Sequence, residues 1–279
     1  MLPNKSRMRN HARLVGFTLA IGAAACSFAL AAILTGPSRV ESNLDDRFYA
    51  QLLHDHRIVS GSPLQIEADA VGARVSDAAA PLYGSRFRFF MVNDPSPNAF
   101  VAFGSRVYVD SGLVRYVDNE DELAGVLCHE VSHSIHHDAF IATVREMRYD
   151  AATQELVTRA ERATRGHLSK AIDAAGNFAE VLLLLHYSRA QEQRADLSGA
   201  RVCARASYNP WGLVWLFRKM DRDPRMSHAH RLRWFSDHPS NAAREKALTK
   251  YITRNAAWFE SYPSDAPRGR SRTATHSVP

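Results

Sequence analysis

Apolar residues recur along the chain with two different spacings, one typical of helices and the other of strands. Helical spacing covers residues 64–80, and alternation typical of a strand follows in Arg86–Asp94. A second extended run, residues 99–113, comes after a turn-rich segment that contains two prolines. Two strands joined by such a segment predict a small antiparallel sheet.

Most of the remaining chain has helical patterns. Asn119 precedes Glu122 by three residues, which is the form of a helix-capping pair, so a helix is predicted from there to about Phe140. Further helical patterns fall in residues 143–174, 179–208 and 237–248. The predicted fold class is therefore mainly α with a small antiparallel β-sheet (α+β).

An uncharged apolar run near the start, Leu14–Gly36, follows a basic lead. It is long enough to cross a bilayer, which takes about 20 apolar residues. A cleaved signal peptide has a shorter apolar stretch, although Ala29–Ala31 fits a cleavage site. We expect an uncleaved anchor in the inner membrane with everything after Pro37 on the periplasmic side, because basic flanks stay in the cytoplasm. Cleavage would leave a periplasmic protein.

Composition narrows the function classes. The net charge is +6 over 279 residues, but much of the basic excess lies at the two ends of the chain. The sequence also lacks the alternation of aromatic and basic residues that is typical of RNA-binding proteins. Nucleic acid is therefore not an expected partner. Three cysteines are too few for a disulfide scaffold. Cys128 and Cys203 are expected to be buried thiols, with a disulfide between them as the alternative.

The segment VLCHEVSHSIHH (126–137) carries the chemistry. On a helix, His129 and His133 lie on one face and can hold one ion, with Glu130 beside it. This is the H-E-x-x-H pattern of zinc peptidases, in which the glutamate takes a proton from water activated by the metal. A chance match is the alternative, but solvent-facing histidines would not usually be flanked by apolar Leu127 and Val131.

A tetrahedral zinc ion needs a third protein ligand besides these two histidines. The metzincin pattern would place glycine and histidine where His136 and Ala139 stand, so that class is excluded. Glu192 is a candidate ligand, and Asp196 one turn later could hold a ligand imidazole by its remaining N–H. By spacing alone, ordinary surface ion pairs on a charged helix are an equal alternative.

HEVSH (129–133) together with YSRAQEQRAD (187–196) resembles the gluzincin metallopeptidases that include HtpX, BepA, LoiP and the CAAX prenyl endoproteases. The resemblance implies that Glu192 is the third zinc ligand and that Asp196 supports the metal site from behind the ligands. It also implies that the helix carrying both residues ends at Gly199. NAFVAFGSRVYVDSGL (98–113) is similar to a strand segment of the family, although Phe103 and Ser105 replace a proline and a glycine.

A later segment, HPSNAAR (238–244), is also similar to this family. The resemblance implies that His238 approaches the zinc and that Arg244 helps to organise the cleft. By chemistry alone, His238 either donates to the oxyanion that forms on the scissile carbonyl or caps the zinc in a resting state. An ordinary surface histidine before a proline is the alternative.

Together these features predict a zinc-dependent endopeptidase with one Zn²⁺ per chain and Glu130 as general base. An extended polypeptide is expected to add as a strand along Asn98, Ala99, Phe100 and Val101. The resemblance implies damaged or misassembled envelope proteins as substrates. A proteolytically quiet zinc-binding chaperone or partner-binding module is the alternative. The expected division is 1–13 basic lead, 14–36 anchor, 37–261 peptidase domain and 262–279 disordered tail.

Overall fold

The computed structural model describes residues 36–55, 57–142, 187–224, 238 and 241–267. The chain divides into two units, Met1–Gly36 and Pro37–Pro279, and the fold below is that of the second unit. The anchor expected at residues 14–36 falls outside the described residues, apart from Gly36. Among the helices that are described, none combines the length and the apolar character that a membrane span requires.

Helices surround one small sheet. The helices are α2 (Arg39–His54), α3 (Pro63–Tyr83), α4 (Ser111–Tyr116), α5 (Glu120–Ile135), α9 (Arg189–Arg205), α10 (Gly212–Arg222), α12 (Asn241–Arg254) and α13 (Ala256–Phe259). The strands are β1 (Ile58–Val59), β2 (Arg88–Val92), β3 (Ala99–Val101) and β4 (Arg106–Asp110). The predicted class, mainly α with a small sheet, is confirmed.

The sheet is mixed, so the prediction of a purely antiparallel sheet is wrong. Its order is β1-β2-β4-β3, with β3 at one edge. The β1–β2 and β3–β4 pairs are antiparallel, but β2 and β4 run parallel. The second extended run therefore forms two strands, and only the second of them pairs with β2.

Gly104 explains this difference. Its φ of +66° lies in the left-handed region that glycine adopts readily, so the chain reverses there and forms a hairpin. A side chain at this position would also approach Asp45 Oδ2 to 2.7 Å. The reversal sends β4 back across the sheet between β3 and β2, which makes its pairing with β2 parallel.

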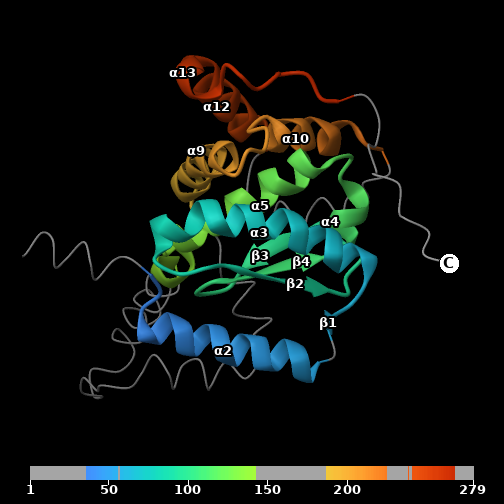
Figure 1. Ribbon diagram of the computed structural model, residues 1–279, viewed down its shortest axis with the longest axis vertical. Helices are drawn as coiled ribbons and strands as arrows, with labels where there is room; N and C mark the ends of the chain where they lie inside the picture. Colours follow the sequence, from blue (N-terminus) through green and yellow to red (C-terminus); the bar gives the residue numbers. More distant parts are fainter. Residues whose placement is uncertain (1–35, 56, 143–186, 225–237, 239–240, 268–279) are drawn as a thin grey trace, which may run out of the picture. The chain divides into compact units, whose positions relative to one another are not determined.

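The two faces of the sheet are covered by different helices (Figure 1). Helix α2 lies on one face, where Leu44, Phe48 and Leu52 pack with Tyr108 of β4. Helices α3 and α5 cover the other face and share the larger hydrophobic core, to which β4 contributes its alternate side chains Val107 and Val109. Because side chains alternate along a strand, β4 is buried on both faces.

The predicted helices are present where the structure describes them, but the helix expected to continue to about Phe140 is interrupted: α5 ends at Ile135, and residues 136–137 form a turn. The helix expected over residues 64–80 is α3, and the expected cap is present: the Asn119 side chain accepts a hydrogen bond from the Glu122 N–H at 2.9 Å. The Glu122 carboxylate reaches the Asp118 N–H. Residues 143–174 and the start of the segment 179–208 lie outside the described part of the chain.

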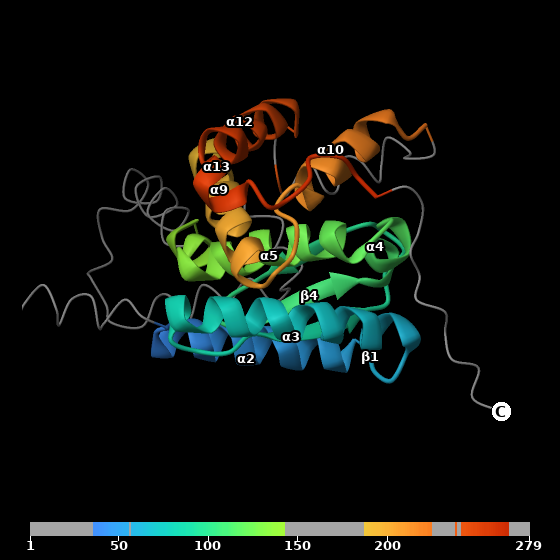
Figure 2. The same ribbon diagram turned by 45° about the horizontal axis from the view of Figure 1, so that its top comes forward.

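Helix α9 packs closely on α5, and Figure 2 shows α9, α10 and α12 gathered on the side of α5 away from the sheet. Gly199 lies within α9, so the expectation that it ends the helix is wrong. A Cβ at Gly199 would lie 3.2 Å from the backbone of Cys128 and His129. The residue is needed for close approach of the two helices.

A disulfide joins the same two helices. Cys128 of α5 and Cys203 of α9 are bonded, with Cα atoms 5.8 Å apart, so the expectation of two buried thiols is wrong. Cys128 directly precedes His129. The bond therefore fixes the segment that carries the first histidine of the H-E-x-x-H pattern against the helix that carries Glu192.

Replacing Cys203 with alanine is expected to lower the free energy of unfolding by about 2–4 kcal/mol, because the bond closes a long loop in the unfolded chain. The loop spans a sequence separation of 75. Chemical denaturation of wild type and Cys203→Ala, each with and without reductant, measures the effect. Reductant should destabilise only the wild type; equal stability of the two oxidised proteins would contradict the disulfide's role.

The first residues of the expected tail make contacts. The Tyr262 hydroxyl donates to the Ala204 carbonyl at 3.0 Å, and the Trp215 indole donates to the Ser264 carbonyl at 2.8 Å. These contacts hold the chain after α13 against α9 and α10. Residues 268–279 lie outside the description.

Candidate metal centre

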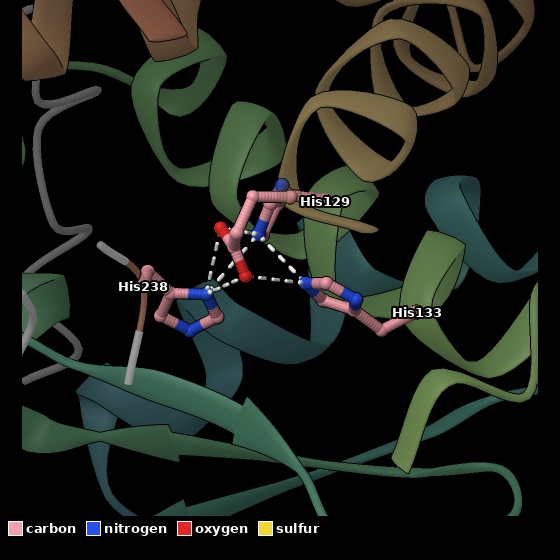
Figure 3. Close-up of side chains that lie close together, drawn as sticks. His129, His133 and His238 are labelled. Carbon is pink, nitrogen blue, oxygen red and sulfur yellow. Dashed lines mark hydrogen bonds and ion pairs between the residues drawn. The ribbon is translucent and has the colours of Figure 1, made fainter. Parts of the chain in front are cut away.

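Helix α5 places His129, Glu130 and His133 in the interior, where none of them is more than 1% exposed. The two histidines are one turn apart on one face, and their Nε2 atoms lie 3.0 Å from each other. Figure 3 shows both imidazoles directed to one point. The two histidines, which the sequence places four residues apart, therefore direct their imidazoles to the same point.

Helix α9 brings Glu192 to the same point. Its Oε1 lies 3.3 Å from His133 Nε2, and its Oε2 lies 3.5 Å from His129 Nε2. Glu192 is fully buried, so the alternative of a solvated surface ion pair does not describe it. Potential ligand atoms of His129, His133, Glu192 and His238 all lie within 4.8 Å of one another.

The hydrogen bonds of the two imidazoles indicate which nitrogen faces this point. His129 Nδ1 lies 3.0 Å from Asp196 Oδ1, and His133 Nδ1 lies 2.9 Å from Asp138 Oδ2. An ionised carboxylate only accepts hydrogen bonds, so we assign a proton to each Nδ1 of the neutral rings. Both Nε2 atoms then present lone pairs beside the Glu192 carboxylate, and this donor set fits a cation such as zinc.

The electrostatics of the site also favour positive charge. Burial opposes charge on His133, but hydrogen bonds from its ring to Asp138 and Glu192 outweigh this and raise its pKa to about 9. Burial likewise opposes ionisation of Glu192, yet the charges of His238 and Arg244 hold its pKa well below the usual range. Without metal, a proton on His133 supplies positive charge where a bound cation would otherwise do so.

Arg244 of α12 organises the carboxylates behind the ligands. It contacts Asp196 twice, through Nε at 2.9 Å and Nη2 at 2.7 Å, and its Nη1 lies 2.7 Å from Glu192 Oε2. Its guanidinium also lies over the Phe217 ring, 4.9 Å from the ring centre. Asp196 thus joins His129 to a buried arginine.

His238 lies against the same cluster, as Figure 3 shows. Its Nδ1 is 3.0 Å from Glu192 Oε1 and 3.3 Å from His129 Nε2, and its Nε2 is 3.5 Å from Glu130 Oε1. It is 1% exposed, so the alternative of an ordinary surface histidine is wrong.

Glu130 has no hydrogen bond to its carboxylate oxygens within the described part of the chain. Burial raises the pKa of Glu130, although the neighbouring charges of His238 and His133 oppose the shift. A carboxylate with a raised pKa accepts a proton more readily than an ordinary glutamate does. Glu130 is therefore the one acid of the cluster whose environment suits proton transfer.

The predicted substrate segment, residues 98–101, forms the edge of the sheet. The Asn98 carbonyl accepts a hydrogen bond from the Asp110 N–H at 2.9 Å, so it faces β4. Since backbone groups alternate in direction along a strand, those of Phe100 also face β4, and those of Ala99 and Val101 face outward. Of the four residues, only these last two turn their backbone groups away from β4, and the Val101 carbonyl already accepts a hydrogen bond from the Tyr187 hydroxyl at 3.5 Å.

Sequence reasoning missed residues around His133. The Tyr187 ring stacks on this imidazole with centroids 4.0 Å apart, and its hydroxyl donates to the Val101 carbonyl at 3.5 Å. Asp138 accepts from the His133 ring, and it also contacts Gln191 and Arg194 of α9. Asp138 stands five residues after His133, a spacing that no helical pattern would have selected.

The chain is similar to known proteins over most of this region. Residues 65–252 match the profile described as Peptidase family M48. The mitochondrial metalloendopeptidase OMA1 of Schizosaccharomyces pombe is 28% identical over 204 residues, covering 71% of this chain and 56% of that protein. The beta-barrel assembly-enhancing protease of Yersinia pestis is 30% identical over 223 residues, covering 67% of this chain and 45% of that protein.

The chain spans about half the length of these curated relatives. The profile match contains the H-E-x-x-H helix, the Glu192 helix, His238 and Arg244, which are the elements that form the buried cluster. This chain therefore belongs to peptidase family M48, a family of metallopeptidases.

Proposed function

We propose that this protein is a zinc-dependent endopeptidase in which His129, His133 and Glu192 hold the metal. The observation that carries the proposal is the convergence of two imidazole nitrogens and one carboxylate in a fully buried cluster, beside a glutamate whose carboxylate has no hydrogen bond to the described residues. Three protein ligands of this kind are typical of catalytic zinc sites. When bound, zinc would polarise the scissile carbonyl and make water a stronger nucleophile at neutral pH.

Glu130 is the general base of this proposal. It accepts a proton from the attacking water and returns it to the nitrogen of the leaving amine, so it ends each cycle ionised. Its raised pKa supports both steps. Asp196 and Arg244 keep the His129 imidazole and the Glu192 carboxylate in place during the reaction.

An extended polypeptide would bind by adding a strand to β3. Ala99 and Val101 direct their backbone groups away from β4 and would form the new ladder once the Tyr187 hydroxyl releases the Val101 carbonyl, whereas Asn98 and Phe100 would hold the edge strand on β4. Strand addition uses backbone groups common to all peptides, so it accepts many sequences. This favours unfolded or misassembled proteins as substrates.

His238 closes the cluster in the described conformation. A catalytic zinc site keeps one position for water and substrate, but here a fourth side chain reaches the same group of atoms. This favours the resting-state role over oxyanion binding for His238 in this conformation. The protein in this form is latent, and His238 must move before a substrate carbonyl can enter.

Replacing His238 with alanine is therefore expected to raise the rate of casein cleavage by roughly 10-fold, which corresponds to about 1.4 kcal/mol of lost resting-state stabilisation. Initial rates of His238→Ala and wild type at equal zinc loading measure it. A matched control is His54→Ala, since His54 is exposed and lies on α2. A fall in rate for His238→Ala alone would favour oxyanion stabilisation instead.

The proposed activity is tested by incubating the purified full-length chain with unfolded casein and identifying the products by mass spectrometry. An endopeptidase gives new termini within the casein sequence, and a zinc chelator abolishes them. Binding of casein without new termini, in both wild type and His238→Ala, would favour the proteolytically quiet zinc-binding module.

The cellular setting is part of the proposal. The named relatives include a mitochondrial metalloendopeptidase and a beta-barrel assembly-enhancing protease, which supports substrates among membrane or envelope proteins. We propose that residues 37–261 form the peptidase domain and that residues 14–36 anchor it at the periplasmic side of the inner membrane. Residues 1–13 would then be a cytoplasmic lead, and residues 262–279 a tail after the domain. Tags at each end, labelled from each side of the membrane, test this topology.

A further inference from the structure

Asp138 is a buried carboxylate that the proposed mechanism does not use. It lies three residues beyond the end of α5, is fully buried, and places Oδ2 2.9 Å from His133 Nδ1. On a continued helix, residues five apart point in directions about 140° apart, so they would not meet. The backbone must therefore change direction after Ile135 to bring Asp138 back towards His133.

His137 supplies this turn. Its φ of +54° lies in the left-handed region, which is uncommon for a residue other than glycine, and it follows the C-cap His136. The His137 imidazole in turn contacts Glu41 of α2, with Nδ1 2.8 Å from Oε1. This contact offsets part of the cost of the left-handed conformation and holds the turn against α2.

The second oxygen of Asp138 is held by α9. Gln191 donates from Nε2 to Oδ1 at 3.1 Å, and the Arg194 guanidinium pairs with the same oxygen. These two residues flank Glu192 in sequence. Asp138 therefore connects one candidate ligand, the His133 ring, to the helix that carries another.

The arrangement repeats the one at His129. There, Asp196 contacts Nδ1 at 3.0 Å and is itself bound by Arg244. In each case an imidazole with Nε2 towards the cluster has a buried carboxylate on Nδ1 and an arginine on that carboxylate. Such partners fix the tautomer and orientation of a ligand histidine.

We propose that Asp138 is a positioning residue of the metal centre, which keeps the proton of His133 on Nδ1 and its Nε2 directed to the metal. The inference rests on the proposed function, because it assigns His133 as a ligand. The chain also contains a matched control: His54 and Asp55 form an exposed pair, with Nδ1 3.2 Å from Oδ1.

Zinc affinity tests the proposal directly. Dissociation constants are measured for full-length wild type, Asp138→Asn and Asp55→Asn by competition with a chelating dye. Asp138→Asn is expected to bind zinc about 10- to 100-fold more weakly than wild type, and Asp55→Asn equally well. Equal affinity of Asp138→Asn and wild type would overturn the proposal and leave the proposed function intact, whereas a wild type that binds no zinc would contradict both.

A second measurement uses only the wild type, so it does not depend on whether a variant folds. Nitrogen NMR of zinc-loaded wild type with labelled histidines reports which ring nitrogen carries the proton. The His133 ring should be protonated at Nδ1, with slow exchange of that proton, while the ring of exposed His54 exchanges rapidly. Zinc bound through Nδ1 of His133, or an Nδ1 proton that exchanges as fast as that of His54, would overturn the role of Asp138.

Discussion

Glu130→Gln is expected to retain its zinc and to cleave casein at least about 10³-fold more slowly than wild type. The amide has nearly the same size as the carboxyl group but cannot take a proton from water or return it to the leaving amine. General acid and base catalysis contributes about 10²- to 10⁴-fold. Because Glu130 lies beside the ligands and is buried with a raised pKa, a neutral side chain of this shape should disturb neither the fold nor the metal site.

The measurement compares initial cleavage rates and zinc content of Glu130→Gln, Glu120→Gln and wild type. Glu120 lies on the same helix and is exposed, so its variant controls for the chemical change alone. Glu120→Gln should cleave at the wild-type rate. Cleavage by zinc-loaded Glu130→Gln within a few fold of wild type would remove Glu130 from the mechanism.

Glu192→Ala is expected to lose zinc binding, with a fall in affinity well beyond the roughly 100-fold that loss of an outer partner costs. The substitution leaves two imidazoles, fewer than the three protein ligands of a typical catalytic zinc site. It also leaves the Arg244 Nη1 group without its carboxylate, 2.7 Å from where Glu192 Oε2 had been. An arginine that faces the site without this carboxylate repels a cation.

Calorimetric titration with zinc measures this loss, and circular dichroism of the metal-free proteins checks the fold. Glu245→Ala is the control, since Glu245 also pairs with an arginine, Arg218, but lies partly exposed on α12. Glu245→Ala should bind zinc as wild type does. Undiminished zinc affinity in Glu192→Ala would show that the third ligand is another residue.

The parts of the site that lie on one helix could be predicted from the sequence. His129 and His133 are close in space because any α-helix places residues four apart on one face, and the Asn119 cap marks where that helix begins. Glu192 comes from a different helix, so periodicity alone left it undecided between a ligand and a surface ion pair. Its assignment needed a resemblance between whole motifs.

Other features depend on backbone geometry that composition does not reveal. The parallel pairing of β2 and β4 follows from one left-handed glycine, Gly104, inside a run that reads as a single strand. The contact of Asp138 with His133 follows from one left-handed histidine, His137. The disulfide depends on how closely α5 and α9 approach, which Gly199 permits.

The most direct test of the account is a zinc titration of metal-free wild type and Glu130→Gln, with bound zinc and casein cleavage measured on the same samples. We expect wild-type cleavage to rise with added zinc and reach its plateau at about one equivalent per chain, as for a single catalytic ion. Glu130→Gln should bind the same equivalent without cleaving. Wild-type cleavage that is independent of zinc would contradict the account. Full zinc binding by wild type without any cleavage, even under conditions that move His238 away from the other three ligand residues, would also contradict it.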